Sequence, residues 1–396
     1  MKRRWRWLAL LVLIIALVMI AAYSGRQAYY RSDYYRRKAT TRLSSFFGLP
    51  IEIDNMKSLG FSGMQFFGLS AWLPDHRSRV LQAPEILWDE SVGGKEGGVV
   101  VHLHDAHWTL GQGTWQSGDY MRVLRASLAH DFKEVNLRRA VLHDNRIEWF
   151  TRDFHLVTEK VEGRIEFEPD GTGRAALTAA TLNGRPVSSG IEITARIDPM
   201  ADDLIPEVSL QVPAVPLDLL GLDDVLASRL TQGQFAGQLT IRQSSATNEF
   251  VFAGHIKDVR LDEATPRLPG GAVGGTTDLV VREALVRNGR LVGLSFSGEW
   301  RDMEFETLWG RWSPRPLGGR VQLAVQEGRL SESGIESLRL RGEWRGASLD
   351  ALCQMLLGRS GLAGRLLMNV HSFHVEKNTL KDGDIDIGAD LPRGER

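Results

Sequence analysis

Three histidines close together form the densest group of metal-ligating side chains in the sequence. One leucine separates His102 from His104, and His107 follows shortly after them. Strand alternation places His102 and His104 on the same face, and His107 joins them only past a bulge. No cysteine or second histidine pair lies nearby to complete a tetrahedral set. We expect the solvated face of a strand here, and no bound metal.

Acidic side chains between tryptophans are the best candidates for glycan hydrolysis. Asp302, Glu304 and Glu306 lie between Trp300 and Trp309. A glycosidase needs two carboxylates that flank an aromatic cleft. These three alternate along one segment, which is typical of the exposed side of a strand. The tryptophans, which include Trp300, Trp309, Trp312 and Trp344, fit a glycan site and sheet packing equally well.

Other patterns of catalytic residues are missing from the sequence. It contains no G-x-S-x-G motif, which holds the nucleophile of many serine hydrolases. The glycines between Gly270 and Gly275 lack the lysine and the following helix of a phosphate loop. Cys353 lies in an apolar segment and is expected in the core. We therefore expect a protein that is not an enzyme, with no catalytic residue and no cofactor.

Composition narrows the possible partners. The formal net charge is −1, whereas a nucleic-acid-binding protein should carry a basic surplus, so nucleic acid is not an expected partner. Apolar residues make up 43 % and charged residues 24 % of the chain, which is typical of a folded protein. The single cysteine cannot form an internal disulfide.

The N-terminus predicts a membrane anchor. Basic residues precede an uncharged apolar run from Trp7 to Tyr23, which as a helix would reach roughly 25 Å. Residues 1–23 are predicted to be a transmembrane signal-anchor, and a cleavable signal peptide is the alternative. Residues 24–47 predict a juxtamembrane helix that ends before Gly48 and Pro50. Either interpretation sends the bulk of the chain across the membrane.

Beyond Pro50, apolar residues alternate with polar ones, which predicts antiparallel strands with one apolar and one polar face. We expect an N-terminal β region at 48–200 and a second region at 201–396 that continues the sheet. The alternation is clear at 162–168, 191–197, 208–212, 321–325, 338–341 and 385–391. Turns are predicted at Asp170-Gly171, Asn183-Gly184, Asn288-Gly289 and Asp382-Gly383.

Two short helices and several repeated segments interrupt this pattern. Helices are predicted at Pro216–Leu230 and Ser348–Leu357, each preceded by a strand. They are followed by the similar segments Phe235–Leu239 and Leu362–Leu366. The segment Gly298-Glu-Trp-Arg301 is repeated as Gly342-Glu-Trp-Arg345. Such loose repetition favours a sheet that grows along one axis.

The predicted apolar faces need a cover, because about 25 cal/mol per Å² is lost where they contact water. Helices are too few for this, so the sheet must form a sandwich, a barrel or a trough filled by an apolar ligand. In a trough, acyl chains would contact the apolar side chains. The candidate lipid-binding residues are Ile191, Ile193, Val208, Leu210, Phe250, Phe252, Val321 and Leu323.

The sequence resembles the AsmA-like family of membrane-anchored proteins of Gram-negative bacteria. The resemblance lies in the order of the N-terminal elements. The predicted membrane span and the juxtamembrane helix are followed by the segments at residues 43–54 and 68–75. The resemblance recurs where 216–220 is followed by 234–240, and where 348–352 is followed by 364–366. The family is similar to bridge-like lipid-transfer proteins. Membership implies an elongated, curved, trough-like antiparallel sheet with a few short helices. It also implies an inner-membrane anchor and a periplasmic location.

The function expected from this resemblance is to bind or help move phospholipid between envelope membranes, as part of outer-membrane lipid homeostasis. Membrane lipids and the inner membrane are the expected partners, together with envelope proteins. The alternative is a non-enzymatic scaffold or assembly factor for outer-membrane proteins, which would present a closed core and exposed sheet edges for strand addition.

Overall fold

The structure is a computed structural model. Within the ranges below, the side chains of 2–14, 46, 110, 150, 243, 248 and 355–357 are not described. The described residues are 2–59, 63–73, 78–90, 98–110, 136–150, 155–201, 207–220, 231–243, 248–264, 273–287, 290–304, 317–358 and 363–391.

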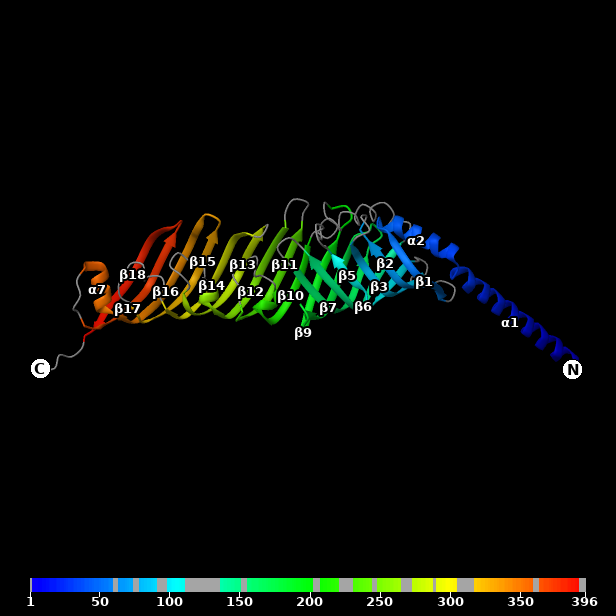
Figure 1. Ribbon diagram of the computed structural model, residues 1–396, viewed down its shortest axis with the longest axis horizontal. Coiled ribbons are helices and arrows are strands. Elements are labelled where there is room, and N and C mark those ends of the chain that lie inside the picture. Colours follow the sequence, from blue (N-terminus) through cyan, green and yellow to red (C-terminus); the bar gives the residue numbers. More distant parts are fainter. Residues whose placement is uncertain are drawn as a thin grey trace. The chain divides into compact units, whose positions relative to one another are not determined.

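In its described residues the protein is mostly β: 18 strands form one long sheet, and helices are few (Figure 1). This confirms the predicted fold class at that level. The strands are β1 (Ile51–Leu59), β2 (Gly63–Trp72), β3 (Arg79–Asp89), β4 (Val99–His104), β5 (His107–Leu110), β6 (Leu137–Phe150), β7 (His155–Phe167), β8 (Gly173–Leu182), β9 (Arg185–Ile197), β10 (Glu207–Pro216), β11 (Gln234–Gln243), β12 (Asn248–Arg260), β13 (Gly274–Arg287), β14 (Arg290–Glu304), β15 (Arg320–Ser331), β16 (Gly334–Ser348), β17 (Arg365–Glu376) and β18 (Thr379–Asp390).

Two consecutive helices precede the sheet: α1 (Lys2–Tyr30) and α2 (Asp33–Phe47). The helix predicted at 24–47 is present but is broken between them, because the hydroxyl of Ser32 accepts a hydrogen bond from Tyr35 N and begins a new helix. It ends as predicted, at Gly48, whose φ of 63° is left-handed. The Arg36 guanidinium donates to Asp54 O of β1 at 2.9 Å.

The predicted transmembrane segment 1–23 falls largely on side chains that the structure does not describe. In the described part of the chain, no helix is both long and apolar enough to cross a membrane.

The chain divides into two compact units. The first comprises residues 1–150, 157–179 and 194–206, and the second comprises 151–156, 180–193 and 207–396. In the first unit, β1, β2, β3 and β4 are successive antiparallel neighbours, and β6 runs parallel to both β4 and β5. Buried apolar residues oppose one another across these strands, as in the series Met56, Phe66, Ile86, Leu103 and Leu142.

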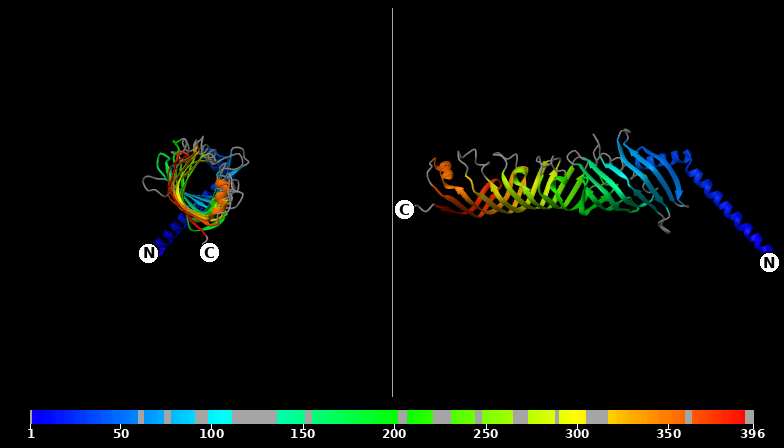
Figure 2. Two further views of the ribbon diagram at one scale, coloured as in Figure 1. Left: turned by 90° about the vertical axis from the view of Figure 1, so that its left-hand side faces the viewer. Right: turned by 60° about the horizontal axis from the view of Figure 1, so that its bottom comes forward.

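In the second unit, β10 to β18 pair in chain order, each antiparallel to the next. These strands curve, as their end-on view in Figure 2 shows. Within the described residues of this unit, three short helical segments lie between these strands: η2 (Leu217–Leu220), α5 (Leu261–Ala264) and α7 (Leu349–Leu357). The helix predicted at Ser348–Leu357 is therefore confirmed, with Ser348 as its N-cap. Of the helix predicted at Pro216–Leu230, only η2 forms within the described residues, and 221–230 lie outside them.

Glycines at strand bulges bend this sheet. A Cβ on Gly254 of β12 would lie 2.3 Å from Ala236 O, and one on Gly298 of β14 would lie 2.3 Å from Asp278 O. The strand register shifts beside both glycines. Neighbouring strands therefore approach so closely there that only glycine fits, and each bulge increases the local twist.

One predicted turn is wrong. Asp382-Gly383 lies inside β18, opposite His374 and Phe373 of β17. The chain turns instead at Lys377 and Asn378, whose φ angles are 49° and 58°. A two-residue hairpin with a type I′ turn needs positive φ at both positions, and asparagine tolerates it. The Asn183-Gly184 turn is confirmed, with φ angles of 47° and 77°, and Asn288-Gly289 lies outside the described residues.

Candidate functional site

One side of the second unit carries apolar side chains that oppose one another from strand to strand. We call this side the apolar face and define it by four rows of cross-strand partners. The rows are Val208, Ile241, Phe250 and Val286; Leu210, Leu239, Phe252, Ala284, Leu294, Leu330 and Ile335; Trp300, Leu323, Gly342, Val370 and Ile385; and Met303, Val321, Trp344, Met368 and Ile387.

The rows run almost without polar interruption. Thr277, next to Trp300 across β13 and β14, is a buried polar residue on this face, and its hydroxyl donates to Glu299 O at 3.2 Å. Pairing its hydroxyl with a backbone carbonyl removes the cost of burying it. The side chains on the described part of the apolar face are therefore almost all apolar from β10 to β18.

Burial changes along the unit. Leu210 and Leu239 are 3 % and 1 % exposed, whereas Ile385 and Ile387 at the other end are 41 % and 66 % exposed. The described helical segments that pack on the strands of this unit are short, so much of the shielding comes from apolar side chains that face one another across a curved sheet.

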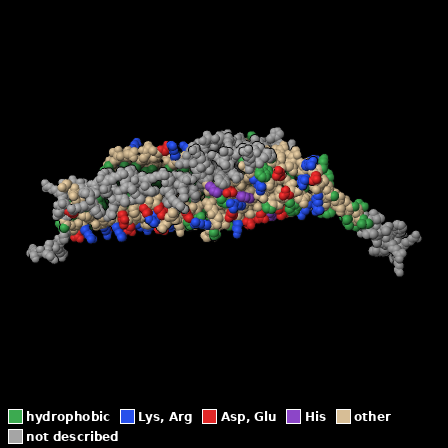
Figure 3. Space-filling model, viewed as in Figure 1, with side chains coloured by type: hydrophobic (Ala, Val, Ile, Leu, Met, Phe, Trp, Pro, Cys, Tyr) green, Lys and Arg blue, Asp and Glu red, His purple; other side chains and the backbone are tan. Residues whose placement is uncertain are grey.

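The opposite side of the same strands is polar. Arg242 of β11 pairs with Glu207 of β10 at 3.0 Å, and Arg287 of β13 pairs with Glu249 of β12 at 2.7 Å. Figure 3 shows basic and acidic side chains interspersed over the second unit. Exposed pairs of this kind stabilise little, but they keep this side in water.

All eight candidate lipid-binding residues lie in the second unit. Ile191 and Ile193 are buried in β9, which pairs with β10. The other six belong to the rows of the apolar face. Val208, Leu210, Phe250 and Val321 are buried, while Phe252 and Leu323 are half-buried. The ring of Phe252 also meets that of Phe235 edge-on, with the centroids 6.5 Å apart.

Two tryptophans that sequence reasoning left open belong to this face. Trp300 and Trp344 pack against a cluster of Leu261, Val273, Met303 and Val321. The indole Nε1 of Trp344 donates to Gly318 O at 3.2 Å. These two tryptophans therefore pack the sheet, while Trp309 and Trp312 lie outside the described residues.

The candidate carboxylates do not form a hydrolytic pair in the described region. Asp302 has a φ of 51° at a bulge, is exposed, and pairs with Arg320 at 3.4 Å. Glu304 is exposed at the end of β14, and Glu306 lies outside the described residues.

The histidines of the first unit are arranged differently from the predicted group. His102 and His104 do share a face, but their third neighbour is His143 of β6, and His102 Nδ1 lies 3.2 Å from its Nε2. Parallel pairing of β4 with β6 brings His143 there, and alternation within single strands does not reveal such a pairing. His107 contacts Glu148 at 3.2 Å instead. The rings stack rather than converge, and the described residues contain no group of ligands able to hold a metal.

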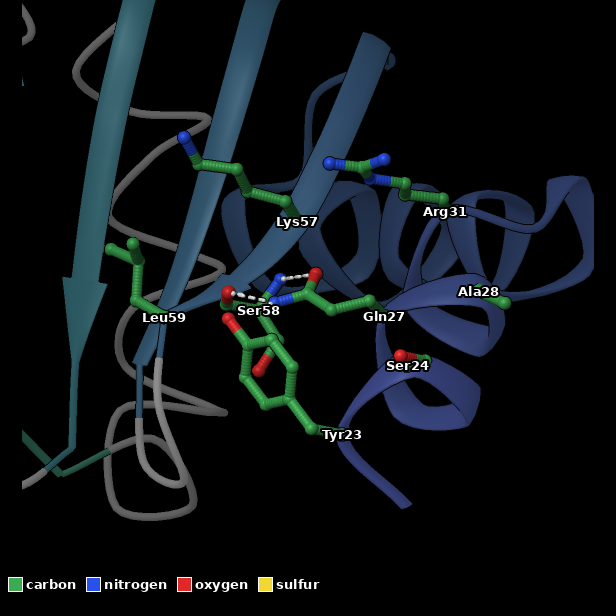
Figure 4. Close-up of a pocket in the computed structure, with 8 residues that line it drawn as sticks. All are labelled: Tyr23, Ser24, Gln27, Ala28, Arg31, Lys57, Ser58 and Leu59. Atoms are coloured by element: carbon green, nitrogen blue, oxygen red, sulfur yellow. Dashed lines mark hydrogen bonds between the residues drawn. The ribbon is translucent and has the colours of Figure 1, made fainter. Parts of the chain in front are cut away.

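A hollow lies where α1 meets β1 in the first unit. The Gln27 side chain donates to Ser58 O at 2.7 Å and accepts from Ser58 N at 3.3 Å, so its amide pairs with β1 as a further strand would (Figure 4). Arg31 and Lys57 line the hollow together with Tyr23. Two cations beside the end of the apolar run from Trp7 suit anionic groups.

Comparison of the chain with family models, curated proteins and solved structures gives no match.

Proposed function

We propose that this protein is a membrane-anchored, AsmA-like periplasmic protein that binds phospholipid acyl chains along its apolar face and so helps to move lipid between envelope membranes. The observation that carries the proposal is the continuity of apolar partners over nine successive strands of the second unit. An acyl chain of about fifteen methylenes gains roughly 12 kcal/mol on leaving water. A continuous hydrocarbon lining keeps this free-energy gain while the acyl chain moves along the apolar face.

The exposure of the apolar face supports a ligand rather than a closed core. Ile385 and Ile387 are exposed, and Phe252 and Leu323 are half-buried although they stand in the middle of their rows. Contiguous exposed apolar surface is typical of binding sites. The protein carries out no chemistry on the lipid under this proposal.

The anchor is part of the proposal. Ile15, Leu17, Val18, Met19 and Ile20 of α1 are between 51 % and 64 % exposed, on all sides of one helix. A helix that is apolar all round belongs in a hydrocarbon environment. The hollow with Arg31 and Lys57 would then lie at the level of the lipid headgroups, where Tyr23 also fits.

Lipid content of the purified full chain tests the proposal. The protein is extracted in a mild detergent and its bound phospholipid is measured by mass spectrometry after solvent extraction. We expect bound phospholipid, and a loss of most of it in the variants Leu210→Asp and Phe252→Asp.

Matched substitutions on the polar side control this experiment. Gln211→Asp and Ala253→Asp place the same carboxylate one residue further along each strand, on the opposite side, and should retain the lipid. Circular dichroism confirms that each variant is folded. A lipid-free wild-type protein, or equal loss in the variants of both sides, contradicts the proposal and favours an envelope scaffold.

A further inference from the structure

One edge of β18 pairs with no other described strand of the second unit. Within the described part of this unit β18 pairs with β17 and with no other strand, and all twelve of its residues are exposed. Figure 1 shows β18 at the C-terminal end of the unit. A long strand with an open row of backbone donors and acceptors is a template for another strand.

The apolar side of β18 continues the rows of the apolar face. Ile385 and Ile387 oppose Val370 and Met368 of β17, and Leu380 opposes Val375. Leu380 is 57 % exposed, whereas Leu366 one strand earlier is 3 % exposed. A further strand with apolar side chains at matching positions would cover these residues.

The polar side of β18 is strongly acidic. It carries Asp382, Asp384, Asp386 and Asp390, opposite His374, Ser372, Asn369 and Arg365. Within the described part of the unit, the side-chain contact that these aspartates make is between Asp386 and His371 of β17, at 2.9 Å. Elsewhere in the unit, acidic residues on this side form ion pairs with an arginine on a neighbouring strand. The pairs are Glu207 with Arg242, Glu249 with Arg287, and Asp278 with Arg301. By the same arrangement, the strand beyond β18 should be basic.

A second copy of β18 does not meet that requirement. In the antiparallel register that pairs Ile385 with Ile385 of the other copy, for example, Asp384 of each copy would oppose Asp386 of the other. Like charges directly opposite destabilise a strand pair. The acidic side therefore opposes self-association, while it favours a strand of opposite charge.

We propose that β18 accepts a strand from a partner protein, and that this strand alternates arginine or lysine with aliphatic residues. The strand adds antiparallel or parallel to β18, places its aliphatic residues on the apolar face and sets its cations against Asp384 and Asp386. This interaction extends the sheet of the second unit and does not depend on lipid binding.

A peptide-binding experiment tests the proposal. The full chain in a neutral detergent is titrated against a fluorescent nine-residue peptide that alternates arginine and valine, with anisotropy as the readout. We expect binding, and at least a tenfold weaker affinity for the variant Asp384→Lys/Asp386→Lys. A glutamate–valine peptide should bind this variant better than it binds the wild-type protein.

Two controls separate strand addition from general attraction of charges. Glu192→Lys/Glu332→Lys changes the net charge equally at exposed positions outside β18 and should leave the affinity unchanged. An arginine–valine peptide methylated on alternate backbone nitrogens keeps its charge but cannot pair along one edge, and should not bind. No binding up to about 1 mM, equal weakening in both double variants, or full binding of the methylated peptide would overturn the proposal.

Discussion

At the scale of residues, the repeated Gly-Glu-Trp-Arg segments have a structural meaning. Gly298 and Gly342 stand where neighbouring strands approach closely, and two residues later Trp300 and Trp344 reach the apolar face. Next along the chain, Arg301 and Arg345 point to the other side and pair with Asp278 and Glu343. The repetition was visible in the sequence. The reason for its glycine was not, because a close approach depends on the neighbouring strand.

Removing one of these tryptophans tests the packing. Trp344→Ala should lower the free energy of unfolding by about 2 kcal/mol, less than for a fully buried aromatic because Trp344 is half-buried. Trp344→Phe keeps a ring but loses the hydrogen bond to Gly318 O, and should cost about 1 kcal/mol. Urea unfolding followed by circular dichroism measures both. Equal stability of the alanine variant and the wild type would show that this ring does not stabilise the sheet.

The stacked histidines make stability depend on pH. Burial, and then the neighbouring His143 and His104, hold the pKa of His102 below its usual value. The unfolded chain therefore binds this proton more tightly than the folded one, so the free energy of unfolding should fall as the pH drops below about 6.5. Urea midpoints are measured at about pH 7.5 and about pH 5.5. The midpoint of His102→Asn should fall less between these two pH values than the midpoint of the wild type. The exposed His255 provides a control. Between the same two pH values, the urea midpoint of His255→Asn should fall as much as that of the wild type.

At the scale of elements, the alternation of apolar and polar residues predicted the strands well. The segments at 191–197, 208–212 and 321–325 lie in strands, and so does 385–391 except for its last residue, Leu391. The error at Asp382-Gly383 arose because a glycine after aspartate also fits a strand, where Gly383 opposes the ring of Phe373. Lys377-Asn378, which forms the turn, carries a weaker signal in the sequence.

Glycine at a bulge should be hard to replace. In Gly254→Ala the new Cβ would lie 2.3 Å from Ala236 O and 2.7 Å from the Cα of Gly237, and backbone cannot move aside cheaply. We expect a loss of about 3 kcal/mol in the free energy of unfolding. Gly293→Ala is the matched control, because its Cβ would come no closer than 4.0 Å to Leu330 O. Similar stability of the two variants in urea would show that the bend does not need glycine.

At the scale of the whole molecule, the sequence predicted one apolar and one polar side but left open how the apolar side is covered. Strand pairing in chain order from β10 to β18 decides against a second layer formed by these strands of the second unit. That order depends on which strands pair, and alternation within single strands carries no information about it. The same holds for the parallel pairing of β6 in the first unit.

The proposed anchor predicts how the full chain behaves in cells. It should stay in the membrane fraction after an alkaline carbonate wash. Ile15→Arg/Val18→Arg should be released, because each arginine in the middle of a span costs about 3 kcal/mol. Ile15→Leu/Val18→Leu should stay in the membrane. Retention of the arginine variant would contradict the anchor.

Photocrosslinking in living cells shows whether acyl chains contact the apolar face of the second unit. A photoreactive phenylalanine analogue is placed at Leu323, on the apolar face, or at Ala324, its neighbour on the polar side. After irradiation, the protein is purified and crosslinked phospholipid is identified by mass spectrometry. We expect lipid adducts from position 323 and none above background from position 324. Adducts from neither position, or equally from both, would contradict it.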